Sequence, residues 1–345
     1  MGAARDDWRS VGRAGRSGLQ PGTTIVGLEA DPRGDAPALD ILLQQILNGL
    51  VLGSLYALVA LGYTMVYGIL ELINFAHGEV VMLGALIALA VLGALAGSGL
   101  PTPVILALAI ATAVPICVAT GFVIERVAYR PLRNAPRLAP LITAIGVSIV
   151  LQNLAMIVWG RQYVSLPPLI DLQIYELGGA TVTNLQLAIF VVAAAIMAGL
   201  LALVRGTRLG RAMRATAQNR EVAGLMGVDV NRVISATFMI GSALAAVAGF
   251  LVAAYYGLGH YGMGFMLGLK AFTAAVLGGI GNIPGAMLGG LLLGVIESLG
   301  AGYIGDLTGG FLGSHYQDIF AFLVLILVLV LRPSGLLGER VADRA

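Results

Sequence analysis

Groups capable of catalysis or metal binding are few in this sequence, and they lie far apart. The cysteine and the histidines are Cys117, His77, His260 and His315. This set has no metal-ligand spacing, and nucleophile-elbow and zincin motifs are absent. A Walker-type phosphate loop needs Gly-Lys-Ser/Thr, whereas the single lysine, Lys270, stands between Leu269 and Ala271. We therefore expect no catalytic residue, no metal and no cofactor in this chain, and a membrane-embedded enzyme is a minor alternative.

The remaining groups that could do chemistry are carboxylates in or near apolar stretches, namely Glu71, Glu79, Glu125 and Glu297. An ionisable group at membrane depth costs a few kcal/mol and is usually functional or paired. Lys270 and Glu297 each stand about 13 residues, or roughly 20 Å of helix, from a Gly-Pro turn at 281–284. We expect them to approach each other or to line one cavity. The alternative is a Lys270 side chain that extends to the outer interface.

These groups must be positioned by elements that are stable in a lipid bilayer. The 345 residues are 58% hydrophobic and 11% charged, with a mean hydropathy of +0.92, whereas a soluble domain has about 25% charged residues. A hydrocarbon core about 30 Å thick needs roughly 20 apolar helical residues per crossing. The apolar runs are continuous, unlike the alternating strands of a barrel. The predicted fold is all-α, a polytopic transmembrane helical bundle with about eight to nine membrane segments.

Three regions of different composition divide the chain. Residues 1–40 are rich in Arg, Gly, Ser, Pro and Asp, which predicts a disordered tail. Residues 41–335 form the predicted membrane domain, and residues 336–345 form a cytoplasmic C-terminal tail. Apolar segments are predicted at about 44–68, 76–96, 103–125, 138–159, 186–204, 233–256, 265–281, 285–303 and 317–331. The formal net charge of +2 is too small to indicate nucleic-acid binding.

Arginine clusters between the apolar segments predict which ends face the cytoplasm. One cluster comprises Arg126, Arg130, Arg133 and Arg137, and the second comprises Arg205, Arg208, Arg211, Arg214, Arg220 and Arg232. The C-terminus is placed inside by Arg332, Arg340 and Arg344, and alternation places the loop 160–184 outside. Counting three crossings back from the cluster that begins at Arg126 places the arginine-containing tail outside as well. Either the segment 44–68 is not a simple crossing or the tail is a weak topogenic signal, and we favour the second explanation.

The connection 206–232 is predicted to contain a short surface helix at about 220–226. Asn219 is suited to cap its N-terminus, Glu221 to the positive end of its dipole, and Gly227 to a left-handed terminating residue. Its small and apolar side chains are Val222, Ala223, Leu225 and Met226. Such a face suggests docking onto a cytoplasmic partner. The alternative is a helix that lies on the bilayer surface.

Two further segments interrupt the apolar pattern. The stretch 71–79, Glu-Leu-Ile-Asn-Phe-Ala-His-Gly-Glu, either extends polar groups into the bilayer or forms a solvated cytoplasmic turn. The stretch 270–290 is dense in glycine and contains Pro284. Its composition indicates either a broken helix that exposes backbone at membrane depth or a tight turn between packed helices. The residues alone leave both pairs of alternatives open.

Several stretches, taken together, carry a family resemblance. They are 62–68 (Gly-Tyr-Thr-Met-Val-Tyr-Gly), 74–79, 125–131 (Glu-Arg-Val-Ala-Tyr-Arg-Pro), 141–153, 210–212 and 270–281 (Lys-Ala-Phe-Thr-Ala-Ala-Val-Leu-Gly-Gly-Ile-Gly). In this order they resemble the permease subunits of Liv-type ABC importers for branched-chain amino acids. The similarity covers the chain from Ile41 to Leu337 and leaves the tail 1–40 outside it.

The resemblance implies a bacterial inner-membrane subunit that works by alternating access. Its implied partners are a second homologous permease subunit, two cytoplasmic ATPase subunits and an external substrate-binding protein. The connection 206–232 would hold a cytoplasmic coupling helix, with the coupling residues Arg211, Asn219, Glu221, Ala223, Leu225, Met226 and Gly227. Candidate groups along the translocation path are Asn74, His77, Glu79, Asn153, Lys270, Thr273 and Glu297.

The resemblance implies the class of transporter but does not fix a single cargo. Branched-chain amino acids are the expected cargo. Related permeases look like carriers of urea, short amides or other amino acids. Urea or short amides are therefore the alternative cargo. In such systems the external binding protein sets most of the specificity. A secondary transporter or channel working alone is a further alternative, but it would need intramembrane acids or an ion path.

Overall fold

Long apolar runs form helices because a helix satisfies its backbone N–H and C=O groups within one segment where water is absent. The computed structural model describes residues 37–133, 135–136, 138–169, 171–309, 311, 316–332 and 334–338. Nearly all of the predicted tail 1–40 and most of the tail 336–345 lie outside these residues, as do Arg137, His315, Arg340 and Arg344. The description below concerns the unit that begins at Leu39.

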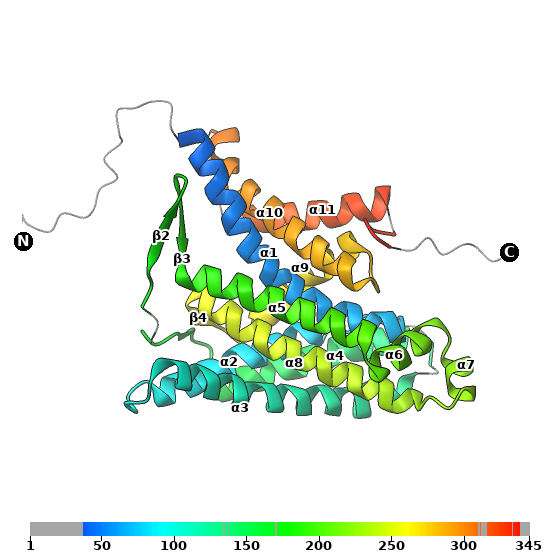
Figure 1. Cartoon of the computed structure of the whole chain (residues 1–345). Helices are drawn as coiled ribbons and strands as arrows, with labels where there is room; N and C mark the ends of the chain where they lie inside the picture. Colours follow the sequence, from blue (N-terminus) through cyan, green and yellow to red (C-terminus); the bar gives the residue numbers. More distant parts are fainter. Residues whose placement is uncertain are drawn as a thin grey trace, which may run out of the picture. The chain divides into compact units, whose positions relative to one another are not determined.

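Every predicted apolar segment corresponds to a helix (Figure 1). The long helices are α1 (Pro37–Leu70), α2 (His77–Leu95), α3 (Thr102–Val123), α4 (Leu138–Trp159), α5 (Asn184–Gly206), α8 (Val230–Tyr256) and α10 (Ile283–Leu307). Within the described residues, seven helices are long and apolar enough to cross a membrane. Two shorter apolar helices are α9 (Met263–Gly278) and α11 (Gln317–Leu331). The predicted polytopic helical fold is confirmed.

Short elements connect these helices. The cytoplasmic connection contains α6 (Arg208–Gln218) and α7 (Arg220–Leu225), and α3 continues through the π-helical turn η1 (Ile124–Tyr129) and the 3-10 turn η2 (Arg130–Leu132). Two antiparallel strand pairs are β1 (Val164–Ser165) with β4 (Leu258–Gly259), and β2 (Ile174–Leu177) with β3 (Ala180–Thr183). The strands, α6 and the π-helical turn were not predicted from the apolar pattern, because they lie outside the apolar runs.

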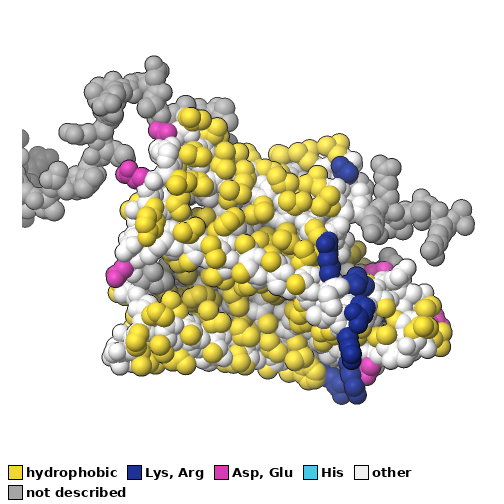
Figure 2. All heavy atoms as spheres, in the orientation of Figure 1, with side chains coloured by type: hydrophobic (Ala, Val, Ile, Leu, Met, Phe, Trp, Pro, Cys, Tyr) yellow, Lys and Arg dark blue, Asp and Glu magenta, His cyan; other side chains and the backbone are white. Residues whose placement is uncertain are grey.

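The core is built around α1, whose residues 55–61 are almost fully buried, and around α2 and α8, which pack along each other and both contact α3. By contrast, α4, α5 and α11 expose large apolar side chains, including Ile149, Val158, Val191 and Leu327. Exposed apolar surface of this extent marks contact with lipid or with another apolar chain. Figure 2 shows this broad hydrophobic face, with the Lys and Arg side chains gathered at one end. The distribution agrees with a membrane-spanning bundle whose basic end faces the cytoplasm.

Glycines allow α1 and α10 to approach closely. A Cβ atom at Gly53 of α1 would lie 2.7 Å from the Leu291 Cα atom. Gly294 of α10 lies in turn against the backbone of Gly53, and Gly49 lies against the backbone of Val295. Small residues at such a seam let two helix backbones approach and gain van der Waals contact within a membrane. The seam fixes α10, which provides one member of the polar cluster described below.

Long-range contacts identify the two ends of α1. Near its start, the Gln44 Oε1 atom accepts a hydrogen bond from the Thr181 N–H at 2.7 Å, so this end lies beside the loop 160–184. At its other end, the Ile69 carbonyl contacts Arg220 in the arginine-rich connection. The helix therefore runs from the outer loop to the cytoplasmic connection. A continuous helix that is long and apolar enough to span a membrane agrees with a simple crossing.

Candidate functional site

The long cytoplasmic connection folds into two helices whose ends are capped by its own side chains. The Thr207 Oγ1 atom accepts a hydrogen bond from the Gly210 N–H at 3.0 Å and caps α6. The Asn219 Oδ1 atom accepts one from the Val222 N–H at 3.0 Å and caps α7. Gly227 follows α7 with a φ of 83°, a left-handed conformation that favours glycine. The predicted short helix and both of its end residues are confirmed.

Helix α7 exposes an apolar tip, which we define as Val222, Leu225 and Met226. Leu225 and Met226 are 83% and 80% exposed, and Val222 is 52% exposed. Ala223, which the sequence grouped with them, is 3% exposed and packs against the chain itself. Ala223 is therefore not part of the exposed apolar surface on which the sequence analysis placed it. Arg211, which lies on the preceding helix α6, is also exposed.

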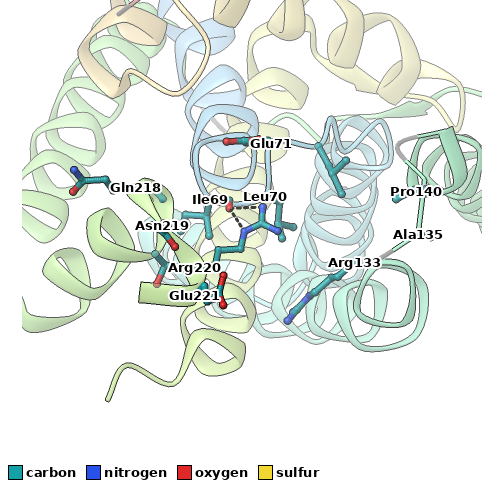
Figure 3. Close-up of a pocket in the computed structure, with 13 residues that line it drawn as sticks. Ile69, Leu70, Glu71, Arg133, Ala135, Pro140, Gln218, Asn219, Arg220 and Glu221 are labelled. Atoms are coloured by element: carbon teal, nitrogen blue, oxygen red, sulfur yellow. Dashed lines mark hydrogen bonds between the residues drawn. The ribbon is translucent and has the colours of Figure 1, made fainter. Parts of the chain in front are cut away.

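Arg220, the first residue of α7, points toward the end of α1 (Figure 3). Its Nε and Nη2 atoms donate hydrogen bonds to the Ile69 carbonyl oxygen at 3.1 and 2.8 Å. The last carbonyls of a helix have no intrahelical donor and lie at the negative end of its dipole, so a guanidinium is stabilised there. Sequence reasoning did not identify this contact because 151 positions separate its two residues.

A cavity of about 420 Å³ lies beside this contact. Its walls are the end of α1 with the following linker, the α3–α4 connection, and the α6–α7 segment (Figure 3). Arg133 lines it and also forms an ion pair with buried Glu125, while its Nη1 atom donates to the Asn231 Oδ1 atom at 2.6 Å. Partial burial lowers the pKa of Arg133, and the Glu125 carboxylate offsets part of this effect. The α3–α4 connection is thereby tied to the start of α8.

A second polar site lies inside the bundle, in the stretch that follows α1. Asn74, His77 and Glu79 are 5%, 2% and 1% exposed, so a solvated turn is the wrong alternative for these three residues. The Asn74 Oδ1 atom accepts a hydrogen bond from the Tyr129 hydroxyl at 3.0 Å. The Glu79 Oε1 atom accepts one from the Ser148 hydroxyl at 3.0 Å. These bonds connect the start of α2 with α4 and with the π-helical turn after α3.

Glycines provide the space for these polar side chains. A side-chain carbon at Gly62 would overlap the His77 ring, and one at Gly264 would lie 2.5 Å from the Glu79 Oε2 atom. Glu71, at the start of the stretch, is exposed and has a φ of 54°, so it ends α1 in the left-handed region. The stretch therefore turns sharply at its exposed first residue and then inserts its polar groups into the bundle.

Lys270 and Glu297 meet in the interior. The Lys270 Nζ atom lies 2.6 Å from the Glu297 Oε1 atom and donates a hydrogen bond to it. The two residues are 6% and 0% exposed, so their predicted approach is confirmed and extension of Lys270 to the outer interface is wrong. The same Nζ atom lies 2.6 Å from the Asp318 Oδ1 atom and 3.2 Å from the Tyr56 hydroxyl oxygen. Sequence reasoning missed Asp318 because it lies at the edge of an apolar segment.

Two candidate path residues do not join these polar sites through their side-chain hydrogen bonds. Thr273 is buried, and its hydroxyl donates to the Leu269 carbonyl oxygen of its own helix at 2.9 Å. Asn153 lies on the exposed side of α4, and its Nδ2 atom donates to the Ile149 carbonyl oxygen at 2.8 Å. Both bonds are local, so neither shows a link to the other candidate residues.

The glycine-rich stretch forms a tight turn between α9 and α10. Gly279 and Gly281 adopt φ values of 105° and 92°, which other residues rarely adopt. The Leu336 N–H donates to the Leu277 carbonyl oxygen at 2.9 Å, and the Leu337 N–H donates to the Gly278 carbonyl oxygen at 3.0 Å. The segment after α11 thus caps the end of α9. Of the two alternatives for this stretch, the tight turn is confirmed.

The apolar exterior and the basic end define a multi-pass membrane protein, and the ion pairs buried among its helices are typical of transport proteins. In the described part of the chain, no group of three or more His, Cys, Asp or Glu side chains is placed to hold a metal ion. Residues 45–329 match the family model described as the permease component of branched-chain amino acid transport systems. The chain belongs to this family.

Relatives match the chain over most of its length. It is 49% identical over 308 residues to the high-affinity branched-chain amino acid transport system permease protein BraD of Pseudomonas aeruginosa, covering 88% of this chain and 98% of the relative. It is 48% identical over 303 residues to LivH of Escherichia coli, covering 86% and 96%. A probable LivH of Methanocaldococcus jannaschii is 27% identical over 310 residues, covering 86% and 92%.

Proposed function

We propose that this chain is the membrane-spanning subunit of an ATP-driven importer that carries branched-chain or related amino acids across the bacterial inner membrane. The family match over residues 45–329 is the observation that carries this proposal. The proposed partners are a second homologous permease, two cytoplasmic ATPases and an external substrate-binding protein. Transport proceeds by alternating access, in which ATP binding favours one of two conformations of the permease pair.

Coupling to the ATPases takes place at α7. The α7 tip places two nearly fully exposed apolar side chains, Leu225 and Met226, outside the membrane domain. Burying such side chains against a partner stabilises the contact by roughly 1.5 to 3 kcal/mol each. The hydrogen bonds from Arg220 to Ile69 then connect α7 directly to α1. A displacement of α7 by a closing ATPase would therefore move the cytoplasmic end of a helix that crosses the whole bundle.

The proposed translocation path uses the polar groups inside the bundle. Glu79 and His77 lie at the start of α2, and Lys270 and Glu297 lie between α9 and α10. Buried polar groups cost free energy unless they are paired, so their retention among apolar helices supports a functional role. Asn153 and Thr273 remain proposals of lower priority, because the bonds shown for their side chains are within their own helices.

The decisive test is purification of the full-length chain from membranes under mild detergent. Co-purification of an ATPase and a second permease, together with ATP-dependent uptake of leucine by the reconstituted complex, is expected. The chain has no Gly-Lys-Ser/Thr sequence, so the separately purified subunit is expected to bind and hydrolyse no ATP. Hydrolysis by the subunit alone, or uptake driven by an ion gradient without ATP, would contradict the proposal.

A further inference from the structure

We propose that Lys270 holds the α-carboxylate and Asp318 the α-ammonium group of an amino acid cargo, and that an adjoining, largely apolar cavity holds its side chain. This inference rests on the proposed function and names the cargo site within it. The charged cluster lies between α9, α10 and α11, which pack together in the bundle (Figure 1), and the cavity is lined mainly by α8, α9 and the loop around β4. It is a low-affinity site on the translocation path that accepts a zwitterion, meaning a molecule with one positive and one negative end.

The first argument is the composition of the cluster. One ammonium group, that of Lys270, faces two carboxylates, those of Glu297 and Asp318, each with an oxygen 2.6 Å from the Nζ atom. Lys270 and Glu297 are almost fully buried, whereas the Asp318 side chain is 36% exposed. A buried ion pair is complete with one carboxylate for each ammonium. Asp318 carries the more exposed of the two carboxylates, so it is the one that can exchange its partner.

The second argument is that hydrogen bonding in the cluster is incomplete. The Glu297 Oε2 atom and the Asp318 Oδ1 atom are both buried, and neither accepts a hydrogen bond of regular geometry. Asp318 Oδ1 is close to Lys270 Nζ in distance but accepts no well-directed hydrogen bond from it. Asp318 is therefore paired in charge but retains unused hydrogen-bond acceptor capacity. An arriving α-ammonium group brings three N–H donors, which matches this deficit.

The third argument is the cavity next to Lys270. Its volume is about 390 Å³, within the range of about 300 to 1,000 Å³ that is typical of small-molecule sites. Its walls combine the charged Lys270 with apolar side chains and with three polar aromatic side chains. The apolar ones are Val252, Leu258, Met263, Met266 and Leu267, and the aromatic ones are Tyr163, Tyr256 and His260. Unbranched methionine side chains adapt to differently shaped apolar groups. The cavity therefore suits an aliphatic side chain whose polar end lies at the cluster.

These arguments define an exchange of ion pairs. When the cargo enters, its carboxylate pairs with the Lys270 ammonium, and its ammonium pairs with the Asp318 carboxylate. The Lys270–Glu297 pair stays in place, so the net charge of the site does not change. A neutral exchange avoids the cost of leaving an isolated charge in a low-dielectric interior. Uncharged urea, or an amine that lacks the carboxylate, cannot complete both pairs.

The test measures occupancy of the cavity through a thiol probe in the full-length chain. Met266→Cys is introduced after Cys117→Ala removes the single native cysteine. The rate of modification by a membrane-impermeant cationic thiosulfonate is followed in membrane vesicles. Leucine at twice its dissociation constant is expected to slow modification roughly threefold, because the free fraction is 1/(1 + [L]/Kd). Leucinol, 4-methylvalerate and urea at the same concentration are expected to leave the rate unchanged.

Matched variants assign the effect to the cluster. Asp318→Asn and Lys270→Gln are expected to abolish protection by leucine, whereas Asp171→Asn, an exposed residue of the outer loop, should retain it. Met263→Cys provides a second probe on another wall if Met266→Cys does not fold. Absence of modification at both probes, equal protection by leucinol or urea, or protection that survives Asp318→Asn would each overturn the inference.

Uptake by the reconstituted importer separates this inference from the proposed function. If the wild-type complex imports leucine and Asp318→Asn imports it at the same rate and half-saturation, the cargo site is wrong and the function stands. If the wild-type complex imports no branched-chain amino acid, the proposed function itself is wrong. The inference expects import by the wild type and a loss of at least tenfold in the variant, equivalent to about 1.4 kcal/mol.

Discussion

Arg220 joins the cytoplasmic helix α7 to the last turn of α1 by donating two hydrogen bonds to the single carbonyl oxygen of Ile69. The two helices otherwise belong to different parts of the molecule, one outside the membrane domain and one through its centre. Because a guanidinium can hold both bonds in one plane, it fixes the direction of α7 as well as its distance. This contact and the neighbouring cavity lead to the first prediction.

Replacing Arg220 by Gln should uncouple ATP hydrolysis from transport. Hydrogen bonds of a charged donor contribute about 1.5 to 3 kcal/mol each, so the position of α7 relative to α1 would be poorly defined. The complex is expected to assemble and hydrolyse ATP, while leucine uptake per ATP falls at least tenfold. Arg232→Gln is the matched control, since Arg232 is 88% exposed and pairs with neighbouring Asp229. Equal losses in both variants would contradict the prediction.

Replacing Leu225 or Met226 by Asp should abolish docking of the ATPase while the chain still inserts. Both residues are largely exposed and lie outside the membrane helices, so the change removes apolar contact area without disturbing the core. Retention of the ATPase on the tagged permease is the measurement. Leu225→Met keeps the apolar surface and should bind normally. A charged variant that retains the ATPase and normal uptake would show that α7 is not the docking element.

Replacing Lys270 by Met should destabilise the chain, because Glu297 would be left buried without its partner. Breaking a buried pair in this way costs about 3 to 5 kcal/mol, whereas replacing both members by apolar residues is often nearly neutral. Thermal unfolding in detergent should therefore show a lower midpoint for Lys270→Met and partial recovery in Lys270→Met/Glu297→Met. Asp229→Asn, in an exposed pair, should change stability by less than about 1 kcal/mol. No recovery in the double variant would count against this account.

Replacing Gly294 by Ala should force α1 and α10 apart. The added carbon would overlap the backbone of Gly53, and two backbones cannot move aside as a flexible side chain can. A lower unfolding midpoint and reduced uptake are expected. Gly199→Ala is the control, because nothing lies within 4 Å of a carbon added there, and alanine favours a helix over glycine by roughly 1 kcal/mol. Equal stability of the two variants would argue against the close seam.

The sequence by itself determined the class of the fold and the limits of most helices. Backbone groups that are shielded from water must form their hydrogen bonds within their own segment. Each apolar run between Ile41 and Leu331 therefore corresponds to a helix, and most helix ends lie within a few residues of the predicted ones, although α1 begins earlier, at Pro37. The caps of α7 at Asn219 and Gly227 were also predictable, since capping depends on residues within one turn. The equal spacing of Lys270 and Glu297 from a turn also predicted their approach, but it left extension of Lys270 to the outer interface as an alternative.

Only the tertiary structure decided which polar groups meet across different helices. The contacts of Arg220 with Ile69 and of Lys270 with Asp318 join residues far apart in the chain, and no local rule relates such residues. Burial of Ala223 against the chain, beside the exposed Leu225, likewise depends on how α7 packs. Whether Asn74, His77 and Glu79 face water or the interior was undecided for the same reason. Their environment is set by neighbouring helices, and glycines such as Gly62 and Gly264 create the space that their side chains occupy.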